Sequence, residues 1–287
     1  MKPEVISFFH DNTATISHLV IDLTTKSCAV IDPVLDYEAA SGRTATTALE
    51  EVISIITKRG LKLEWILETH AHADHLSSAA VLKKRLGGKI GIGDHIVSVQ
   101  ETWKEIYNIP DLSTDGSQFD RLFRDGDTCK IGALDVTVWW LPGHTRADIG
   151  YVMDGAAFVG DTLFMPDYGT ARVDFPGGNA HDLFKSIHRL YTLPDDTELY
   201  LCHDYLPKSG RAKHAFMATV KEQRQGNIHI REGVSEQEFV SMREGRDKTL
   251  ALPALLLPSI QVNIRAGHLP PAEQNGVSYL KIPLNKL

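Results

Sequence analysis

A short segment of the chain holds three histidines and an aspartate at the spacing H-x-H-x-D-H: His70, His72, Asp74 and His75. Imidazole nitrogens and carboxylate oxygens are common protein ligands of zinc and of transition metals. In an extended segment, residues two apart point the same way, so His70 and His72 can face one side. Asp74 and His75 can then serve a neighbouring position. The spacing therefore suits one metal ion or two.

Three further residues with metal-binding side chains stand later in the chain: His144, Asp161 and His203. Each comes just after an apolar run of the kind that forms a buried strand, as does the H-x-H-x-D-H segment itself. These side chains meet if the strands end at one edge of a sheet. A purely structural hydrogen-bonding role is the weaker interpretation of seven metal-binding side chains placed at strand ends. The sequence therefore predicts a metal centre.

The elements that must position these residues follow from the apolar spacing, which alternates in strands and recurs every three to four residues in helices. Strands are predicted over Val5 to Phe9, Ile16 to Leu23, Cys28 to Ile31, Leu63 to Glu68, Leu134 to Trp140, Ile149 to Met153, Ala156 to Val159 and Glu198 to Cys202. Helices are predicted between Thr46 and Gly60, over Leu76 to Leu86, Ile96 to Tyr107, Leu183 to Tyr191 and Arg211 to Gln223, and after the capping box Ser235-x-x-Glu238.

The chain shows no linker and no internal repeat, so we expect one domain over residues 1–287. Five prolines from Pro253 onward predict an irregular C-terminal tail from about residue 250 that wraps the domain. A polar stretch over 107–119 and beyond, with Pro110 and Gly116, is expected to leave the core.

Composition excludes several classes of protein. Lys and Arg number 30 against 37 Asp and Glu, a net charge of −7 without a basic run, which argues against nucleic-acid binding. No apolar stretch is long enough to cross a membrane and none resembles a signal peptide, so we expect a cytoplasmic protein. The three cysteines, Cys28, Cys129 and Cys202, form no C-x-x-C pair and predict neither a disulfide framework nor a thiolate zinc site. The glycine motifs of dinucleotide-binding, serine-hydrolase and P-loop enzymes are absent.

Four motifs together resemble the metallo-β-lactamase superfamily. They are T-H-A-H-A-D-H at 69–75, P-G-H-T at 142–145, G-D-T-L-F at 160–164 and C-H-D-Y at 202–205. The resemblance implies an α/β fold, a four-layer αββα sandwich in which two mixed sheets carry helices on their outer faces. It also places the metal at the common edge of the two sheets, in agreement with the strand ends read from the residues.

Within the superfamily, the stretch from Asp161 to Gly177, which includes G-x-x-R-x-D-F at 169–175, most resembles bacterial persulfide dioxygenases. The resemblance implies that His70, His144 and Asp161 bind one Fe(II). It implies outer-shell roles for the remaining four groups, His72, Asp74, His75 and His203. Two imidazoles and one carboxylate leave positions open on the iron, where a persulfide sulfur and O₂ can bind together. The expected reaction oxidises glutathione persulfide to sulfite and glutathione. The 107–119 insert and the chain beyond about Ile230 fall outside the resemblance.

Glyoxalase II thioesterases resemble the chain through the same ligands and supply the alternative. In that interpretation two Zn(II) ions are bound and a metal-bound hydroxide attacks a thioester. One zinc would be held by His70, His72, His144 and Asp161, and the other by Asp74, His75, His203 and the bridging Asp161. A weaker alternative is a non-catalytic binding module with a structural metal, although structural zinc sites close with four ligands and this set is larger.

Arg172 and Tyr205 align with positions that contact glutathione in related thiol-handling proteins, so the resemblance implies that both bind substrate. A guanidinium matches a carboxylate in geometry, and glutathione carries two carboxylates. Cys202 precedes a ligand, but successive strand residues face opposite ways, so we expect a packed thiol and not a nucleophile. The expected partners are a small thiol persulfide and O₂, and a homo-oligomer is left open.

Overall fold

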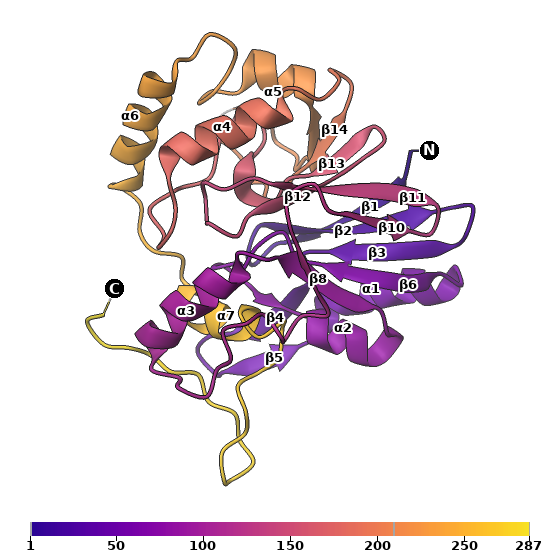
Figure 1. Ribbon diagram of the computed structural model, residues 1–287, viewed down its shortest axis with the longest axis vertical. Coiled ribbons are helices and arrows are strands. Elements are labelled where there is room, and N and C mark those ends of the chain that lie inside the picture. The colour runs from indigo at the N-terminus through magenta and orange to yellow at the C-terminus, as the bar shows by residue number, and fades with distance from the viewer. Residues whose placement is uncertain (1, 209, 287) are drawn as a thin grey trace.

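The computed structural model describes residues 2–208 and 210–286. Two six-stranded sheets pack face to face, and helices cover the outer face of each (Figure 1). Apolar side chains from both sheets fill the space between them, among them Val20, Ile31, Val136 and Tyr151. This is the αββα sandwich that the sequence motifs imply, and the fold class is confirmed.

The first sheet has the strand order β1-β2-β3-β6-β8-β9. Its strands are β1 (Glu4–His10), β2 (Thr15–Asp22), β3 (Ser27–Ile31), β6 (Lys62–Leu67), β8 (Lys89–Gly93) and β9 (Arg121–Phe123). The pairs from β1 to β3 are antiparallel and those from β3 to β9 are parallel. A small separate sheet joins β4 (Val34–Glu38), β5 (Arg43–Ala45) and β7 (Leu76–Ser77).

The second sheet runs in sequence order from β10 to β15. Its strands are β10 (Thr128–Ile131), β11 (Leu134–Trp140), β12 (Ile149–Met153), β13 (Ala156–Phe158), β14 (Glu198–Tyr200) and β15 (Met217–Thr219). Only β13 and β14 pair in parallel, because the chain between them crosses over through a helix.

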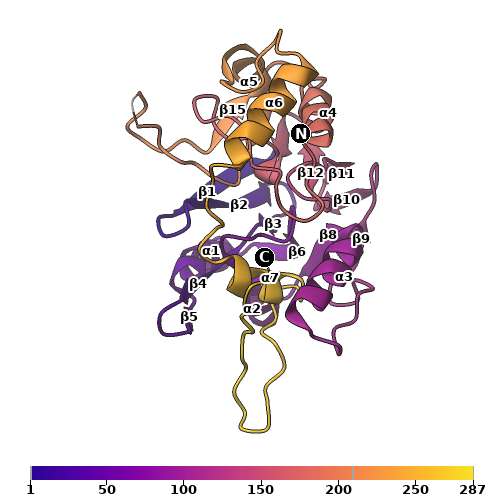
Figure 2. The ribbon, with the colours of Figure 1, turned by 90° about the vertical axis from the view of Figure 1, so that its left-hand side faces the viewer.

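Among the described residues, four helices lie outside the first sheet and three outside the second. The first group is α1 (Thr47–Lys58), α2 (Ala79–Leu86), α3 (Ile96–Tyr107) and α7 (Leu256–Asn263), and the second is α4 (Ala180–Leu190), α5 (Val220–Gly226) and α6 (Glu236–Asp247). Between α6 and α7 the chain therefore crosses from one outer layer to the other, as both ribbon views show (Figures 1 and 2).

The prediction of an irregular tail from residue 250 is wrong for residues 256–263, which form α7. Pro258 stands in the first turn of this helix, where backbone N–H groups have no intrahelical partner, so the proline costs little. Leu256, Ile260 and Ile264 recur every four residues and are buried against the first sheet's helices. The prolines concealed this spacing in the sequence.

Two other predictions also need correction. The helix expected over Arg211 to Gln223 begins only at Val220, because residues 217–219 form β15 and Thr219 caps α5 with Glu222. The stretch over 107–119 does not leave the core, since Ile109, Leu112 and Phe119 are buried in the first helical layer.

Candidate metal centre

The predicted ligands meet at one edge of the two sheets. The segment 69–75 follows β6, His144 follows β11, and His203 follows β14. Asp161 lies in a short 3₁₀ turn, Gly160–Thr162, directly after β13. The sheets are tied together here, because Thr15 of β2 bridges to His203 and the Ile16 N–H donates to the Cys202 carbonyl at 2.7 Å. The structure thus places all seven predicted ligands at the common edge.

The loops that carry the ligands are fixed by buried polar contacts and close backbone approaches. Asp32, at the end of β3, accepts hydrogen bonds from the Thr69 N–H at 2.8 Å and the Thr69 hydroxyl at 2.9 Å. Gly160 has a φ of +51°, and a Cβ there would lie 2.6 Å from the Thr69 hydroxyl oxygen. The two Asp32 hydrogen bonds hold the start of the histidine loop in place. The close approach at Gly160 sets this part of the loop directly against the Asp161 turn.

His70, His144 and Asp161 form a buried group whose ligand atoms lie within 4.8 Å of one another. His70 Nδ1 lies 3.0 Å from the Thr69 hydroxyl, and His144 Nδ1 donates to the Arg172 carbonyl at 2.8 Å. The Nε2 atoms therefore face Asp161 Oδ2, at 4.0 and 3.5 Å. Burial and the neighbouring histidines lower the pKa of His70 well below its usual value, so its imidazole is neutral, as ligation requires.

A second group adjoins this triad. His203 donates from Nδ1 to the Ala14 carbonyl at 3.1 Å, and its Nε2 lies 3.3 Å from Asp74 Oδ2 and 3.4 Å from Asp161 Oδ1. His75 Nδ1 lies 3.5 Å from the same Asp74 oxygen. Within residues 2–208 and 210–286, the buried atoms His75 Nε2, His203 Nε2 and Asp161 Oδ1 have no hydrogen-bond partner. Unpaired buried acceptors of this kind fit a bound metal ion.

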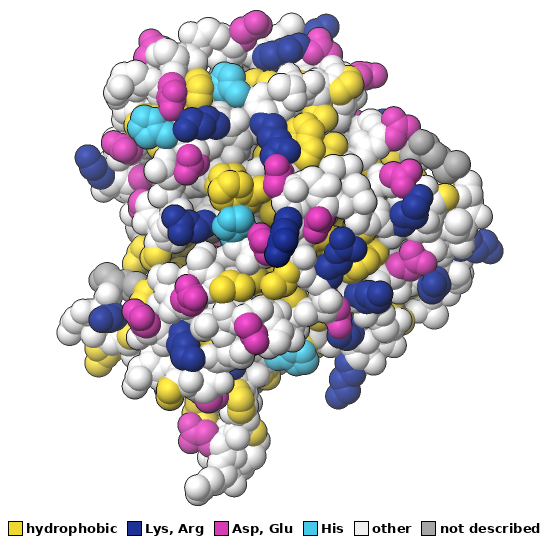
Figure 3. Space-filling model, in the orientation of Figure 1, with side chains coloured by type: hydrophobic (Ala, Val, Ile, Leu, Met, Phe, Trp, Pro, Cys, Tyr) yellow, Lys and Arg dark blue, Asp and Glu magenta, His cyan; other side chains and the backbone are white. Residues whose placement is uncertain are grey.

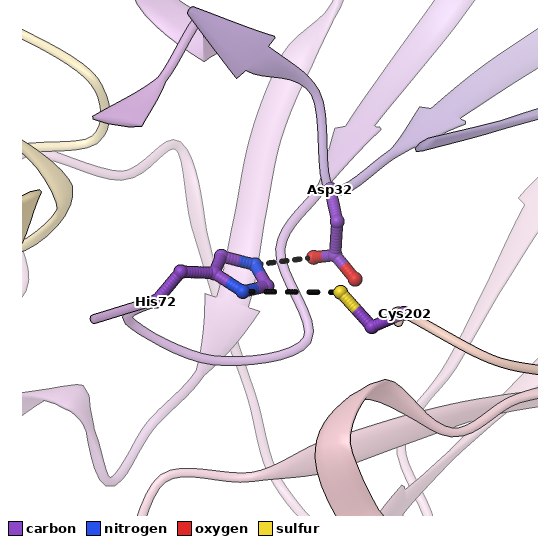
Figure 4. A group of neighbouring side chains, drawn as sticks. All are labelled: Asp32, His72 and Cys202. Atoms are coloured by element: carbon purple, nitrogen blue, oxygen red, sulfur yellow. Dashed lines mark hydrogen bonds and ion pairs between the residues drawn. The ribbon is translucent and has the colours of Figure 1, made fainter. Parts of the chain in front are cut away.

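His72 has different neighbours from the triad. Its Nε2 donates to Asp32 Oδ1 at 2.9 Å, and its Nδ1 faces the Cys202 sulfur at 4.0 Å (Figure 4). Burial raises the pKa of the Cys202 thiol, so the sulfur stays protonated and packed, as expected for this residue. His72 belongs to two groups of side chains that could hold a metal ion. One contains Asp32 and Cys202, and the other contains Asp74 and His75.

A cavity of about 450 Å³ opens beside the triad, and His144, Asp161 and His203 line it. Its other side is formed by the chain that crosses from α6 to α7, including Ala251 and Leu255. The ring of Tyr205 also lines it and lies tilted beside the Tyr168 ring, with centroids 5.0 Å apart. A small molecule could therefore reach the triad.

Arg172 lines the same cavity but is already partly engaged. Its guanidinium donates to both Asp174 oxygens at 2.5 and 2.7 Å and to the Ala251 carbonyl at 2.6 Å. Three of its donors are used in this way and two remain. The exposed Arg246 of α6 also lines the cavity. The substrate-binding roles of Arg172 and Tyr205 stay predictions.

Sequence reasoning missed Asp32 and Asn263, which hold the ligand loop, and Arg246, which lines the cavity. Asp32 carried a usable signal, because it directly follows a buried strand that ends at the same edge as the ligands. Arg246 and Asn263 lie beyond residue 230, where no motif pointed to the site. Elsewhere the surface agrees with the composition: basic and acidic side chains are interspersed on the face in Figure 3.

The fold and the clustered ligands define a metal-dependent protein of the αββα type. The chain belongs to the metallo-beta-lactamase superfamily, whose family model matches residues 15–203. The superfamily comprises metal-dependent hydrolases and oxidoreductases, and the side-chain groups described above lie close enough together to hold a metal ion. No helix in the described part of the chain is long and apolar enough to cross a membrane.

Relatives with different names resemble the chain. It is 52% identical over 294 residues to a "probable metallo-hydrolase" of Burkholderia pseudomallei, covering 99% of both chains. It is 49% identical to glyoxylase B2 of Dictyostelium discoideum, covering 100% of this chain and 98% of the relative. The chain spans only 65% of a longer relative, the beta-lactamase hydrolase-like protein of Xylella fastidiosa, at 51% identity and 99% coverage of this chain.

A more distant relative and a solved structure carry a different name. The human mitochondrial persulfide dioxygenase ETHE1 is 29% identical over 263 residues, which cover 90% of this chain and 87% of that protein. The crystal structure of ETHE1 from Myxococcus xanthus superposes with a TM-score of 0.73 at 27% identity, covering 93% of this chain and all of that one.

Proposed function

We propose that the protein is a mononuclear Fe(II) persulfide dioxygenase that oxidises glutathione persulfide with O₂ to sulfite and glutathione. The observation that carries the proposal is the triad of His70, His144 and Asp161, which groups two imidazoles and one carboxylate and leaves His72 outside. This donor set is typical of non-heme Fe(II) oxygenases. The named human relative and the ETHE1 fold add support.

The side chains of this protein prepare the site for that reaction. The Nδ1 hydrogen bonds of His70 and His144 fix both rings with Nε2 toward Asp161. When bound, Fe(II) supplies open positions at which the persulfide sulfur and O₂ are brought together. The balanced reaction, RSSH + O₂ + H₂O → RSH + SO₃²⁻ + 2 H⁺, releases two protons. Asp74 and the unpaired Nε2 of His75 lie beside the triad as acceptors.

A dinuclear zinc hydrolase is the second candidate, favoured by the names of the relatives at about 50% identity. Asp74 contacts both His75 and His203, and His203 contacts Asp161, which supports a second metal position beside the triad. The first zinc of such a site would need His72 together with His70 and His144. His72 Nδ1 faces Cys202 instead, which favours the mononuclear proposal.

Metal content separates the two candidates. The full chain, expressed without metal supplementation and purified without added metal, should hold iron at about one ion per chain by inductively coupled plasma mass spectrometry. Two zinc ions per chain, together with hydrolysis of a glutathione thioester, would replace the dioxygenase proposal with the hydrolase.

Arg172→Ala should weaken substrate binding and leave the metal in place. Arg172 lines the cavity and keeps two unused guanidinium donors, from which a substrate carboxylate would accept hydrogen bonds. The expected loss is about 1.5–3 kcal/mol, or roughly ten- to a hundredfold in kcat/KM, carried by KM. Tyr205→Phe should cost less.

Steady-state kinetics with a glutathione persulfide and iron analysis check this prediction together. Arg189→Ala is the matched control, because Arg189 also pairs with a carboxylate, Asp125, and lies outside the cavity. An unchanged KM in Arg172→Ala would remove Arg172 from the substrate site. Loss of iron in that variant would assign it a structural role.

A further inference from the structure

The C-terminal helix α7 reaches the metal loop through one buried side chain, Asn263. Its Oδ1 accepts a hydrogen bond from the Ser77 N–H at 2.7 Å. Its Nδ2 donates to the His72 carbonyl at 2.8 Å and to the His75 carbonyl at 2.8 Å. Both hydrogens of the amide and one lone pair are therefore used on the loop that carries four of the seven predicted ligands.

These contacts fix a part of the loop that regular structure does not. The segment from His70 to His75 lies between β6 and β7 without strand or helix of its own. The direction of the His72 and His75 side chains depends on the backbone at those residues. The rings of His70 and His72 lie 4.0 Å apart, so a displaced His72 would also move His70 of the triad.

An apolar residue could not replace Asn263 without cost. Asn263 is buried, so its loss would leave two carbonyls and one N–H without their partner from α7. The chain after the helix packs on the segment that directly follows the loop. A Cβ at Gly267, where φ is +80°, would lie 3.0 Å from the Ser77 carbonyl oxygen and the Ala80 nitrogen. The C-terminal segment is thus fitted against the ligand loop at Asn263 and against the start of α2 at Gly267.

We propose that Asn263 is a positioning residue of the metal centre, through which the docking of α7 sets the geometry of the histidine loop. The proposal rests on the metal centre described above and not on the choice between dioxygenase and hydrolase. It gives the C-terminal segment, which lies outside the 15–203 match, a part in metal binding that acts through the histidine loop.

Cobalt(II) titration of the apoprotein tests the proposal, because it measures affinity and ligand geometry without any turnover. Asn263→Ala should bind Co(II) about ten- to a hundredfold more weakly, with altered d–d absorption bands. Asn263→Asp keeps the size and the acceptor for Ser77 but sets a carboxylate oxygen against two carbonyls. It should weaken Co(II) binding by a similar factor, and it carries the test if the alanine variant does not fold.

Gln261→Ala is the matched control. Gln261 is also a buried amide of α7 and makes three hydrogen bonds, to the Leu257 carbonyl and to both backbone groups of Lys281, all away from the ligands. It should lower thermal stability and leave the Co(II) affinity and spectrum unchanged. Wild-type affinity and spectrum in folded Asn263 variants would overturn the proposal, as would equal weakening in Gln261→Ala. Failure of the wild-type protein to bind Co(II) would instead refute the metal centre itself.

Discussion

Replacing His144 with alanine is expected to empty the metal site and abolish turnover. His144 supplies one of only two imidazoles in the triad, and its Nε2 faces Asp161 at 3.5 Å. Alanine removes that ligand and leaves an open space beside the cavity that water fills. We expect bound iron to fall below about a tenth of the wild-type content, since even loss of an outer-shell partner costs ten- to a hundredfold in affinity.

Iron analysis, with circular dichroism as the check on folding, measures this effect. His70→Ala should behave in the same way, because His70 is the other imidazole of the triad. His72→Ala is the informative comparison, since His72 donates to Asp32 and faces Cys202. It should retain more metal than either triad variant. Full iron content in His144→Ala would show that the triad is wrongly assigned.

Replacing Arg243 with alanine is expected to lower the free energy of unfolding by about 3–5 kcal/mol. Arg243 of α6 is 1% exposed, and its guanidinium donates to Asp247 Oδ1 at 2.9 and 2.5 Å and to the Thr170 carbonyl at 3.0 Å. Asp247 in turn accepts from the Val173 N–H at 2.8 Å. Alanine would leave the Asp247 charge buried and unpaired beneath the wall of the cavity.

Urea denaturation measures this loss. Arg85→Ala removes an exposed ion pair with Glu50 and should cost only about 0–1 kcal/mol, which makes it the matched control. The double variant Arg243→Met with Asp247→Leu should regain much of the stability, because no buried charge is left without a partner. Equal midpoints for Arg243→Ala and Arg85→Ala would contradict the buried-pair interpretation.

The clustering of the seven candidate ligands could be predicted because each is a metal-binding side chain in a segment that follows a strand. The fold followed from the motifs that these ligands share with a known superfamily. The place of Asp32 after a strand indicates its position at the ligand edge, but not its bonds to Thr69 and His72, which join segments about forty residues apart. Such contacts have no period or spacing that marks them in a sequence.

The C-terminal part was predicted least well, for related reasons. Prolines near α7 suggested irregular chain, although Pro258 falls in a first turn that tolerates it. Asn263 lies 188 residues from His75 along the chain, so its role depends wholly on tertiary packing. Helix α5 begins only at Val220 because the Thr219 capping box starts it there and because β15 pairs with β14. The apolar spacing upstream is typical of a helix and does not reveal either interaction.

Oxygen uptake tests the central claim most directly. The anaerobically iron-loaded full chain is mixed with glutathione persulfide in air-equilibrated buffer, while an oxygen electrode records O₂ and sulfite is quantified. Persulfide oxidation predicts that O₂ is consumed and sulfite formed in equimolar amounts, and that the His144→Ala protein gives neither. A flat oxygen trace with the iron-loaded wild-type protein, while the zinc-loaded protein hydrolyses a glutathione thioester, would contradict it.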